Sequence, residues 1–498
     1  MFKRMLALIF MINLLCFSKE VPKKLVYAQS SEATTLYPQD SGDLYSTRVI
    51  FNIFDRLIER DEKLNIVGGL AEKWEQKDEN TLIFHLKKGI KFHKGQKLTS
   101  KDVKYTIDRA KKNPKTSDLF RAISKVETPD LYTVVIKTDE PSASLLYHLT
   151  HVSASIISEE YTENAKDYHI NPNGTGPFKF SEWKVGSKVV ITKNENYFKG
   201  PVLIDTIEIR GIPEENSRVI GLETGEIHIG TEIEGIGRNV LGDVSQVSLE
   251  EVSSLNGLYM GMNTKKGPLS NVNIRKAIAM GIDRDAIIEF FLMGSVEKAN
   301  SFLTPGVFGY SKSAKIYEYN KEKAKKLIEE SGYEKIKLTL TTNNNELRRQ
   351  MCEIIQAQLG EIGIEVKVEI LEWATFLDYT GQGKTDMYML GWSSYTGDAD
   401  HSLTQLIHSS KKGSEGNRSF YENSKVDNLL AKGRKEIRLN ERREIYKEIQ
   451  NIVNEEVPVL PIYFALSNAG VRKEVKGFVQ TPINIPNFYK LSFEEESL

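Results

Sequence analysis

The sequence predicts an α/β protein that is divided into two or more lobes. Its 498 residues are more than a single hydrophobic core usually holds. A strand-like run at 25–29 is followed by helical spacing of apolar residues at 49–57, and such alternation continues along the chain. Two late apolar strands, at 258–263 and 457–478, are candidates to cross between lobes, and a pair of crossing strands forms a hinge.

The N-terminus has the pattern of an export signal. Lys3 and Arg4 precede an unbroken apolar run at 5–16, which is too short to span a bilayer. Cleavage after Ser18 fits the small residues there, so we expect a signal peptide at 1–18 and an exported protein of the periplasm or cell envelope. Cys16 as a lipid-bearing residue is the alternative.

Composition argues against some classes of partner and indicates that the hydrophobic core, rather than disulfides, stabilises the fold. The chain has 67 basic and 68 acidic residues, a formal charge of -1, which gives no reason to expect nucleic acid or an anionic membrane surface as a partner. Besides Cys16, Cys352 is the second of the two cysteines, so the mature chain cannot form an internal disulfide. We expect Cys352 to be a small buried residue.

Several local patterns predict individual elements. The loop at 40–46, which includes Ser46, lies between a strand and a helix and either lines a cleft or is a solvated turn. Residues 81–93 alternate as a hairpin would, and a helix begins at Thr99 or Ser100. After Asn345 a helix is predicted to pack on the sheet through one apolar stripe, which comprises Leu347, Met351, Ile354, Ile355 and Leu359.

The stretch GWSSYTGDADHSL, at 391–403, combines a predicted buried strand at 385–390 with a turn rich in polar groups. Its carboxylates are Asp398 and Asp400. In open α/β sheets, ligands bind beyond the C-terminal ends of the strands, which is where this turn falls. The alternative is an ordinary solvated loop.

The candidate catalytic and metal-binding motifs in this sequence are incomplete. GQGKT at 381–385 has Asp378 where a phosphate loop needs its first glycine, and a strand rather than a helix is predicted after it. His401 beside two carboxylates is an incomplete metal-ligand set. No nucleophile constellation is recognisable, so we expect neither a cofactor nor an enzyme, with a hydrolase as a remote alternative.

Three long blocks resemble, in the same order, the family-5 extracytoplasmic solute-binding proteins: residues 68–110, 171–200 with TGPF, and 257–288. The resemblance implies a two-lobed periplasmic-binding-protein fold of type II, of the large class with an extra subdomain. It implies a lobe I core at 19–58, 180–262 and 468–498, the extra subdomain at 59–179, and lobe II at 263–467. The hinge crossings are expected near Met262 and Ser467.

The resemblance also implies a function. Receptors of this family capture dipeptides, oligopeptides, glutathione, nickel chelates or haem and deliver them to importers of the ABC class. We therefore expect a monomeric receptor that closes its lobes on a small peptide and then docks on permease subunits in the membrane. A nickel-chelate or haem receptor, and a chaperone-like binder of unfolded chains, remain alternatives.

The same resemblance suggests binding residues, because a buried peptide needs partners for both of its charged ends. Asp398 is the first choice for holding the peptide ammonium and Asp400 the second, with Trp392, Tyr395 and the backbone of Gly397 as the pocket wall. The form GWSSYTGDAD is similar to that of glutathione receptors. Segment 339–345 lacks the arginine of dipeptide receptors, which leaves these candidates for the ligand carboxylate: Arg348, its neighbour Arg349, Asn417 and Arg418.

Overall fold

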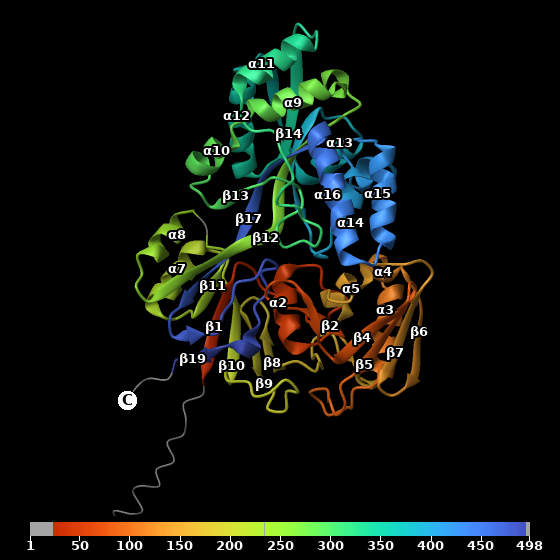
Figure 1. Ribbon diagram of the computed structural model, residues 1–498. Coiled ribbons are helices and arrows are strands. Elements are labelled where there is room, and N and C mark those ends of the chain that lie inside the picture. Colours follow the sequence, from red (N-terminus) through yellow and green to blue (C-terminus); the bar gives the residue numbers. More distant parts are fainter. Residues whose placement is uncertain (1–22, 234, 495–498) are drawn as a thin grey trace, which may run out of the picture.

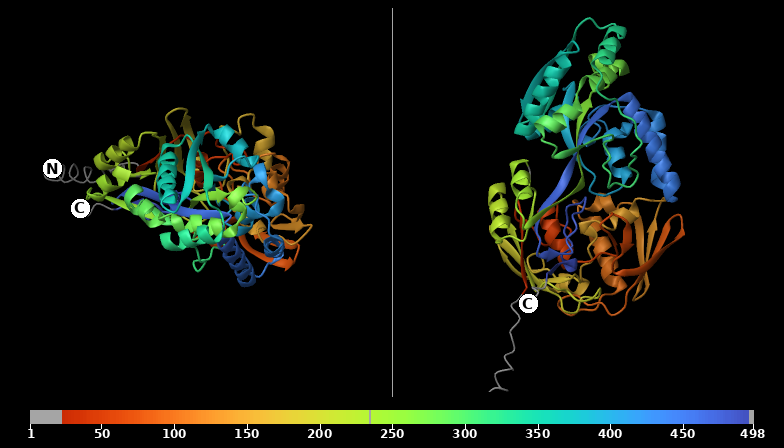
Figure 2. Two further views of the ribbon diagram at one scale, coloured as in Figure 1. Left: turned by 90° about the horizontal axis from the view of Figure 1, so that it is seen from above. Right: turned by 60° about the vertical axis from the view of Figure 1, so that its left-hand side comes forward.

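The computed structural model describes residues 23–233 and 235–494, which form two lobes joined by a pair of long strands (Figure 1). The two further views in Figure 2 show the same division. The expected signal peptide at 1–18 and the alternative lipid site at Cys16 lie outside the described residues. Within the described part, no helix is both long and apolar enough to cross a membrane.

A single sheet of 11 strands continues through both lobes in the order β15-β14-β16-β12-β17-β11-β1-β10-β9-β8, with β13 beside β17. Its two shared strands are β12 (Val247–Met262) and β17 (Val459–Arg472), which pair antiparallel. One half of β12 lies in each lobe, so the hinge is continuous β-structure.

Lobe I packs helix α2 (Leu44–Ile53) onto one face of its part of the sheet, and α7 and α8 contribute to a separate buried cluster with Val26 and Ala28 of β1. The helix begins at Asp43, whose carboxylate accepts the backbone N–H of Ser46 at 2.7 Å. The remaining bounds are β1 Lys24–Gln29, β8 Phe178–Lys184, β9 Lys188–Lys193, β10 Thr206–Gly211, α7 Glu215–Thr224, β11 Ile229–Thr231, α8 Gly235–Gly242, β18 Val475–Lys476, η7 Phe488–Lys490 and β19 Ser492–Phe493.

A second sheet, in the order β4-β5-β7-β6, lies beside the lobe I core and has its own hydrophobic cluster with helix α3 (Ser100–Lys112). The predicted start of α3 is confirmed: Asp102 accepts the backbone N–H of Thr99 at 2.9 Å, as a capping box requires. Other bounds here are β2 Ile58–Arg60, β3 Ile66–Gly68, β4 Ala71–Asp78, β5 Thr81–Leu86, α4 Ser117–Phe120, β6 Ile123–Asp130, β7 Thr133–Thr138, α5 Leu145–His148, η2 Val152–Ala154 and α6 Glu159–Asn164.

The hairpin predicted at 81–93 is wrong. β5 pairs with the strand before it, β4, and with β7, and it makes no pairing with 88–93. The preceding segment, β4, is mostly exposed and consists mainly of polar residues, so the sequence gave no signal for a strand there. Residues 88–93 do alternate between apolar and polar, but they do not form a strand.

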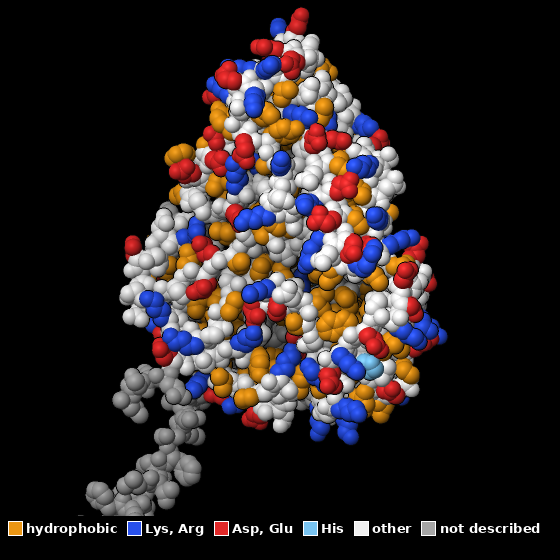
Figure 3. All heavy atoms as spheres, in the orientation of Figure 1, with side chains coloured by type: hydrophobic (Ala, Val, Ile, Leu, Met, Phe, Trp, Pro, Cys, Tyr) orange, Lys and Arg blue, Asp and Glu red, His pale blue; other side chains and the backbone are white. Residues whose placement is uncertain are grey.

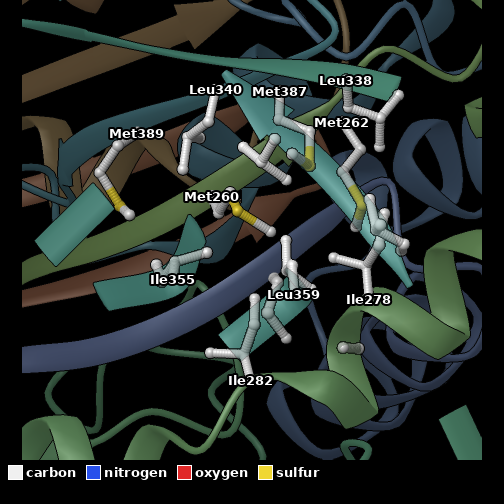
Figure 4. Close-up of a cluster of buried hydrophobic side chains, with 14 of the residues drawn as sticks. Met260, Met262, Ile278, Ile282, Leu338, Leu340, Ile355, Leu359, Met387 and Met389 are labelled. Atoms are coloured by element: carbon white, nitrogen blue, oxygen red, sulfur yellow. The ribbon is translucent and has the colours of Figure 1, made fainter. Parts of the chain in front are cut away.

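Lobe II is a doubly wound unit in which β14 lies between β15 and β16, all three parallel. One buried cluster joins these strands to helices α9 and α12, and a second cluster joins the sheet to α13, α14, α15 and α16. Figure 4 shows the first cluster, in which Met260, Met387 and Met389 of neighbouring strands lie close to Ile355 and Leu359 of α12. The bounds in lobe II are η3 Gly267–Ser270, α9 Val272–Gly281, α10 Arg284–Ala286, η4 Ile287–Phe291, β13 Val296–Lys298, α11 Lys321–Glu330, β14 Ile336–Asn343, α12 Glu346–Gly360, β15 Ile364–Leu371, α13 Trp373–Gly381, β16 Met387–Ser393, α14 Ala399–Ile407, η5 Ser409–Lys411, η6 Gly413–Glu415, α15 Ser424–Lys435 and α16 Leu439–Glu456.

The first crossing strand, β12, is irregular in its middle. Its pairing with β17 shifts between Ser253 and Gly257, and its pairing with β16 begins at Asn256. Met262, at the end of β12, is fully buried in the lobe II cluster. Residues 247–256 contain mostly polar residues and were not recognisable as a strand, which is why the prediction started at Leu258.

Helix α12 begins after Asn345 as predicted, and the side chain of Asn345 accepts the backbone N–H of Arg348 at 2.9 Å. Met351, Ile355 and Leu359 are buried, whereas Leu347 is 42% exposed and is not part of the packed stripe. Cys352 is buried as expected, and burial raises the pKa of its thiol to about 12.

Candidate functional site

The segment 391–403, called the GW turn, begins within the last residues of β16, because Gly391 and Trp392 extend the strand beyond the predicted end at 390. The chain turns after Ser393 and leads into α14. Asp398 is the cap of α14 and accepts the backbone N–H of Asp400 at 2.9 Å. A short aspartate before a helix satisfies an N–H that the helix leaves unpaired. The position of the turn therefore agrees with the prediction, and the contacts of its side chains decide what each residue does.

Asp398 does not present a free carboxylate. Its side chain is 0% exposed, and its two oxygens accept from both terminal nitrogens of Arg442, at 2.5 and 2.8 Å. Burial alone would lower the pKa of Arg442, but the attraction of Asp398 outweighs it and the pKa is raised. Asp398 thus holds α16 to the start of α14, and we revise the expectation that it faces the ligand.

Asp400 is also occupied. Its carboxylate pairs with Arg434 of α15 at 3.2 Å and the residue is 8% exposed. This ion pair ties α14 to α15. The expectation that Asp400 is the second choice for the ligand ammonium is revised for the same reason.

The aromatic residues of the turn are more open. Tyr395 is 42% exposed, and its hydroxyl lies 3.0 Å from Nε2 of His401. The indole N–H of Trp392 donates to Ser402 at 2.9 Å, and its ring stacks on His401 with centroids 5.7 Å apart. These contacts fix the orientation of both rings. Gly397 has φ +73° and its N–H donates to Ser394 at 2.7 Å, so its backbone closes the turn.

Three further predicted residues lie away from an open pocket. The hydroxyl of Ser46 accepts the backbone N–H groups of Thr34 and Thr35 at 2.8 and 3.2 Å and is used in holding the loop before α2. Asn417 is 0% exposed and its amide donates to two backbone carbonyls. Arg418 donates to the carbonyl of Gly413 at 3.2 Å. Each of these side chains has a structural partner, and none lines the cleft described next.

A cleft of about 370 Å³ does bring two of the predicted residues together, Arg348 and Trp392. It lies where β14 and β16 end and where α12 and α13 begin. Its lining also includes residues that sequence reasoning missed, above all Trp373, Tyr463 and Asn256. Trp373 is 43% exposed at the start of α13, and only the structure reveals this exposure.

Arg348 gives this cleft its chemical character. Nη1 of Arg348 donates to the side chain of Asn343 at 3.2 Å, and no carboxylate among residues 23–233 and 235–494 forms an ion pair with it. A Cβ built on Gly391 would lie 3.2 Å from Nη2, so glycine at this position leaves room for the guanidinium. Among the described residues that line the cleft, Arg348 is the charged one. A guanidinium without an ion-pair partner, in a cleft that aromatic side chains also line, suits a carboxylate.

The comparisons with known proteins establish the family. The model of the bacterial extracellular solute-binding proteins, family 5, matches residues 65–414. The chain belongs to this family. It is 29% identical to the dipeptide-binding protein of Escherichia coli over 95% of each chain, and 28% identical to the glutathione-binding protein GsiB of Salmonella choleraesuis over 94% of each. The structure of HbpA2 from Haemophilus parasuis matches with a TM-score of 0.89 and 27% identity, covering 95% of this chain and 100% of that one.

Membership of this family determines the general functional class of the protein. The family consists of extracytoplasmic substrate-binding receptors of ABC importers, so the chain is a receptor and not an enzyme. The type II fold expected from the sequence is confirmed by the solved structures. Among the described residues, no group of three or more histidine, cysteine or acidic side chains is arranged to hold a metal ion.

Proposed function

We propose that this receptor captures small peptides that carry an accessible carboxylate, among them glutathione, dipeptides and short oligopeptides. The observation that carries the proposal is Arg348, a guanidinium without an ion-pair partner in a cleft that Trp373 and Trp392 also line, at the C-terminal ends of two parallel strands. Arg348 lies in the first turn of α12, where the positive end of the helix dipole favours an anion. The printed functions of the dipeptide-binding and glutathione-binding relatives support the same ligand class.

Capture would proceed by closure of the lobes around the hinge formed by β12 and β17. A ligand held by Arg348 in lobe II gains further contacts when lobe I approaches, and only such differential contacts shift the equilibrium towards the closed form. The closed monomer then delivers its ligand to the permease subunits of an ABC importer, where ATP hydrolysis belongs to the partner subunits. Asp398 has no direct role in this proposal because its charge is already neutralised by Arg442.

The proposal is tested by calorimetry with glutathione, a dipeptide and a pentapeptide, after native mass spectrometry of the exported protein for a co-purified ligand. Replacing Arg348→Gln removes a charge-assisted hydrogen bond and is expected to weaken peptide binding by about tenfold or more. The matched control is Arg349→Gln on the same helix, where the guanidinium pairs with Glu346 and Glu353 at the surface. This control should bind peptides as the unchanged protein does.

Two results would contradict the proposal. Equal peptide affinity in Arg348→Gln and Arg349→Gln would place the ligand elsewhere in the fold. Tight binding of a nickel chelate or of haem, together with failure to bind every peptide, would favour the alternative receptor classes.

A further inference from the structure

The two lobes meet at a second place, away from the hinge of β12 and β17. There the extra subdomain of lobe I, with α4 and α5, lies against the ends of α14 and α15 in lobe II (Figure 1). The backbone N–H of Ala143 donates to the carbonyl of Arg434 at 3.2 Å, and Lys435 pairs with Glu140 at 3.1 Å. We call this region the subdomain contact. Because it is made of a few polar bonds and ring contacts rather than a shared core, it can separate while each lobe stays folded.

Three histidines lie at the subdomain contact. His148 ends α5 and His151 precedes η2 in lobe I, whereas His401 lies in the first turn of α14 in lobe II. Tyr395 of lobe II touches one histidine of each lobe: its ring centroid is 5.7 Å from that of His151 and 4.9 Å from that of His401. The folded chain therefore brings together three groups that can each gain a positive charge below neutrality.

The groups around these histidines do not compensate an added proton. Two of them are carboxylates, but each already pairs with an arginine of lobe II. Three others are arginines, which repel a protonated ring. The charged groups that face the three histidines are Asp398, Asp400, Arg56, Arg60 and Arg121, while Asp118 faces Tyr395.

Burial also opposes protonation here. Nδ1 of His148 and Nδ1 of His401 are buried, and neither has a hydrogen-bond partner among the described residues. A protonated imidazole carries an N–H on both nitrogens, so each of these atoms would become a buried donor without an acceptor. Burial lowers the pKa of His401 to about 4 and that of His151 to about 3, and it lowers the pKa of His148 in the same direction.

We propose that the subdomain contact is a pH-sensitive latch, in which protonation of His148, His151 and His401 separates the extra subdomain from lobe II and moves the lobes apart. Separation exposes the rings to water, where a histidine titrates near pH 6.5, so the separated form binds more protons and is favoured as the pH falls. For His401, a pKa of about 4 in the contact and one near 6.5 in water favour separation by up to about 30-fold at pH 5.

The test measures the distance between the lobes in the full exported protein without ligand. Energy transfer between dyes on Leu131→Cys of the extra subdomain and Leu439→Cys of lobe II reports it, since both positions are exposed and Cys352 is buried. Transfer should fall between pH 7.5 and pH 5 and recover when the pH is restored. Far-UV circular dichroism at both pH values shows that the protein remains folded. An unchanged distance would overturn the proposal.

Replacement of all three histidines by glutamine, in the variant His148→Gln/His151→Gln/His401→Gln, should abolish most of the response. The single change His401→Gln should shift its midpoint to lower pH. The matched control is His85→Gln, because His85 lies on β5 of the same subdomain and faces Glu75 rather than lobe II. A triple variant that responds as the control does would also overturn the proposal. The empty receptor is measured, so failure of the latch would leave the proposed peptide binding untouched.

Discussion

At the scale of single residues, charge neutralisation determines the roles in the GW turn. Asp398 caps α14 and Asp400 lies in its first turn, and each meets an arginine from a following helix, α16 or α15. Arg348 meets none. A carboxylate that is buried against an arginine contributes to the fold, whereas a guanidinium without a partner at a cleft is available to a ligand.

This assignment predicts the effect of Asp398→Asn. The substitution leaves Arg442 buried without its counterion, so the free energy of unfolding should fall by about 3 to 5 kcal/mol, as for other broken buried pairs. Denaturant unfolding measures the change, with Asp139→Asn on the surface as control. Unchanged stability combined with lost peptide affinity would instead return Asp398 to the role that the sequence first suggested.

At the scale of elements, helix α12 does two things. Its inner stripe fills the lobe II core between β14, β15 and α9 (Figure 4). Its first turn carries Arg348, which lines the cleft. Packing of the stripe therefore fixes the position of the binding guanidinium. Helix α13 begins with Trp373, which lines the same cleft.

The two faces of α12 should respond differently to truncation. Met351→Ala removes a fully buried side chain and should cost about 2 to 5 kcal/mol of unfolding free energy. Leu347→Ala removes a side chain that is 42% exposed and should cost no more than about 0.5 kcal/mol. Urea titrations compare the two variants. Similar losses would show that the N-terminal turn of α12 packs more closely than its exposure indicates.

At the scale of the whole molecule, partly buried histidines with a lowered pKa occur in both lobes. Burial lowers the pKa of His93 and of His401 to about 4 and that of His151 to about 3. Charged side chains of both signs are interspersed on the face that Figure 3 shows. Because these histidines have a lowered pKa in the folded state, their titration is the main contribution to the pH dependence of stability just below neutrality.

Stability should therefore fall as the pH is lowered from 7 to about 4.5. An unfolded histidine titrates near pH 6.5, so in this window the unfolded chain binds more protons than the folded one and protonation favours unfolding. Carboxylates with lowered pKa, such as Glu436 at about 2 beside Arg438, add to the loss only at lower pH. Denaturant titrations at several pH values measure the slope, and His151→Gln should reduce it. A slope of zero would contradict the prediction.

Much of the fold was predictable because it depends on local patterns. The capped start of α3 and the start of α12 follow from the short-range chemistry of Thr99 and Asn345. The partner of β5 and the first half of β12 were not predictable, because polar segments form strands there only by pairing with distant neighbours. Pairing over long sequence separations leaves no local periodicity.

The sequence by itself determined the family, the two-lobed α/β architecture and the position of the GW turn at the end of a buried strand. Tertiary structure alone decided which charges are free. Asp398 is 44 residues from Arg442 along the chain, and their contact exists only because α14 and α16 pack together. Whether a side chain is neutralised or left available depends on what folding brings within about 4 Å of it. That physical fact moved the candidate site from two aspartates to Arg348 and its aromatic walls.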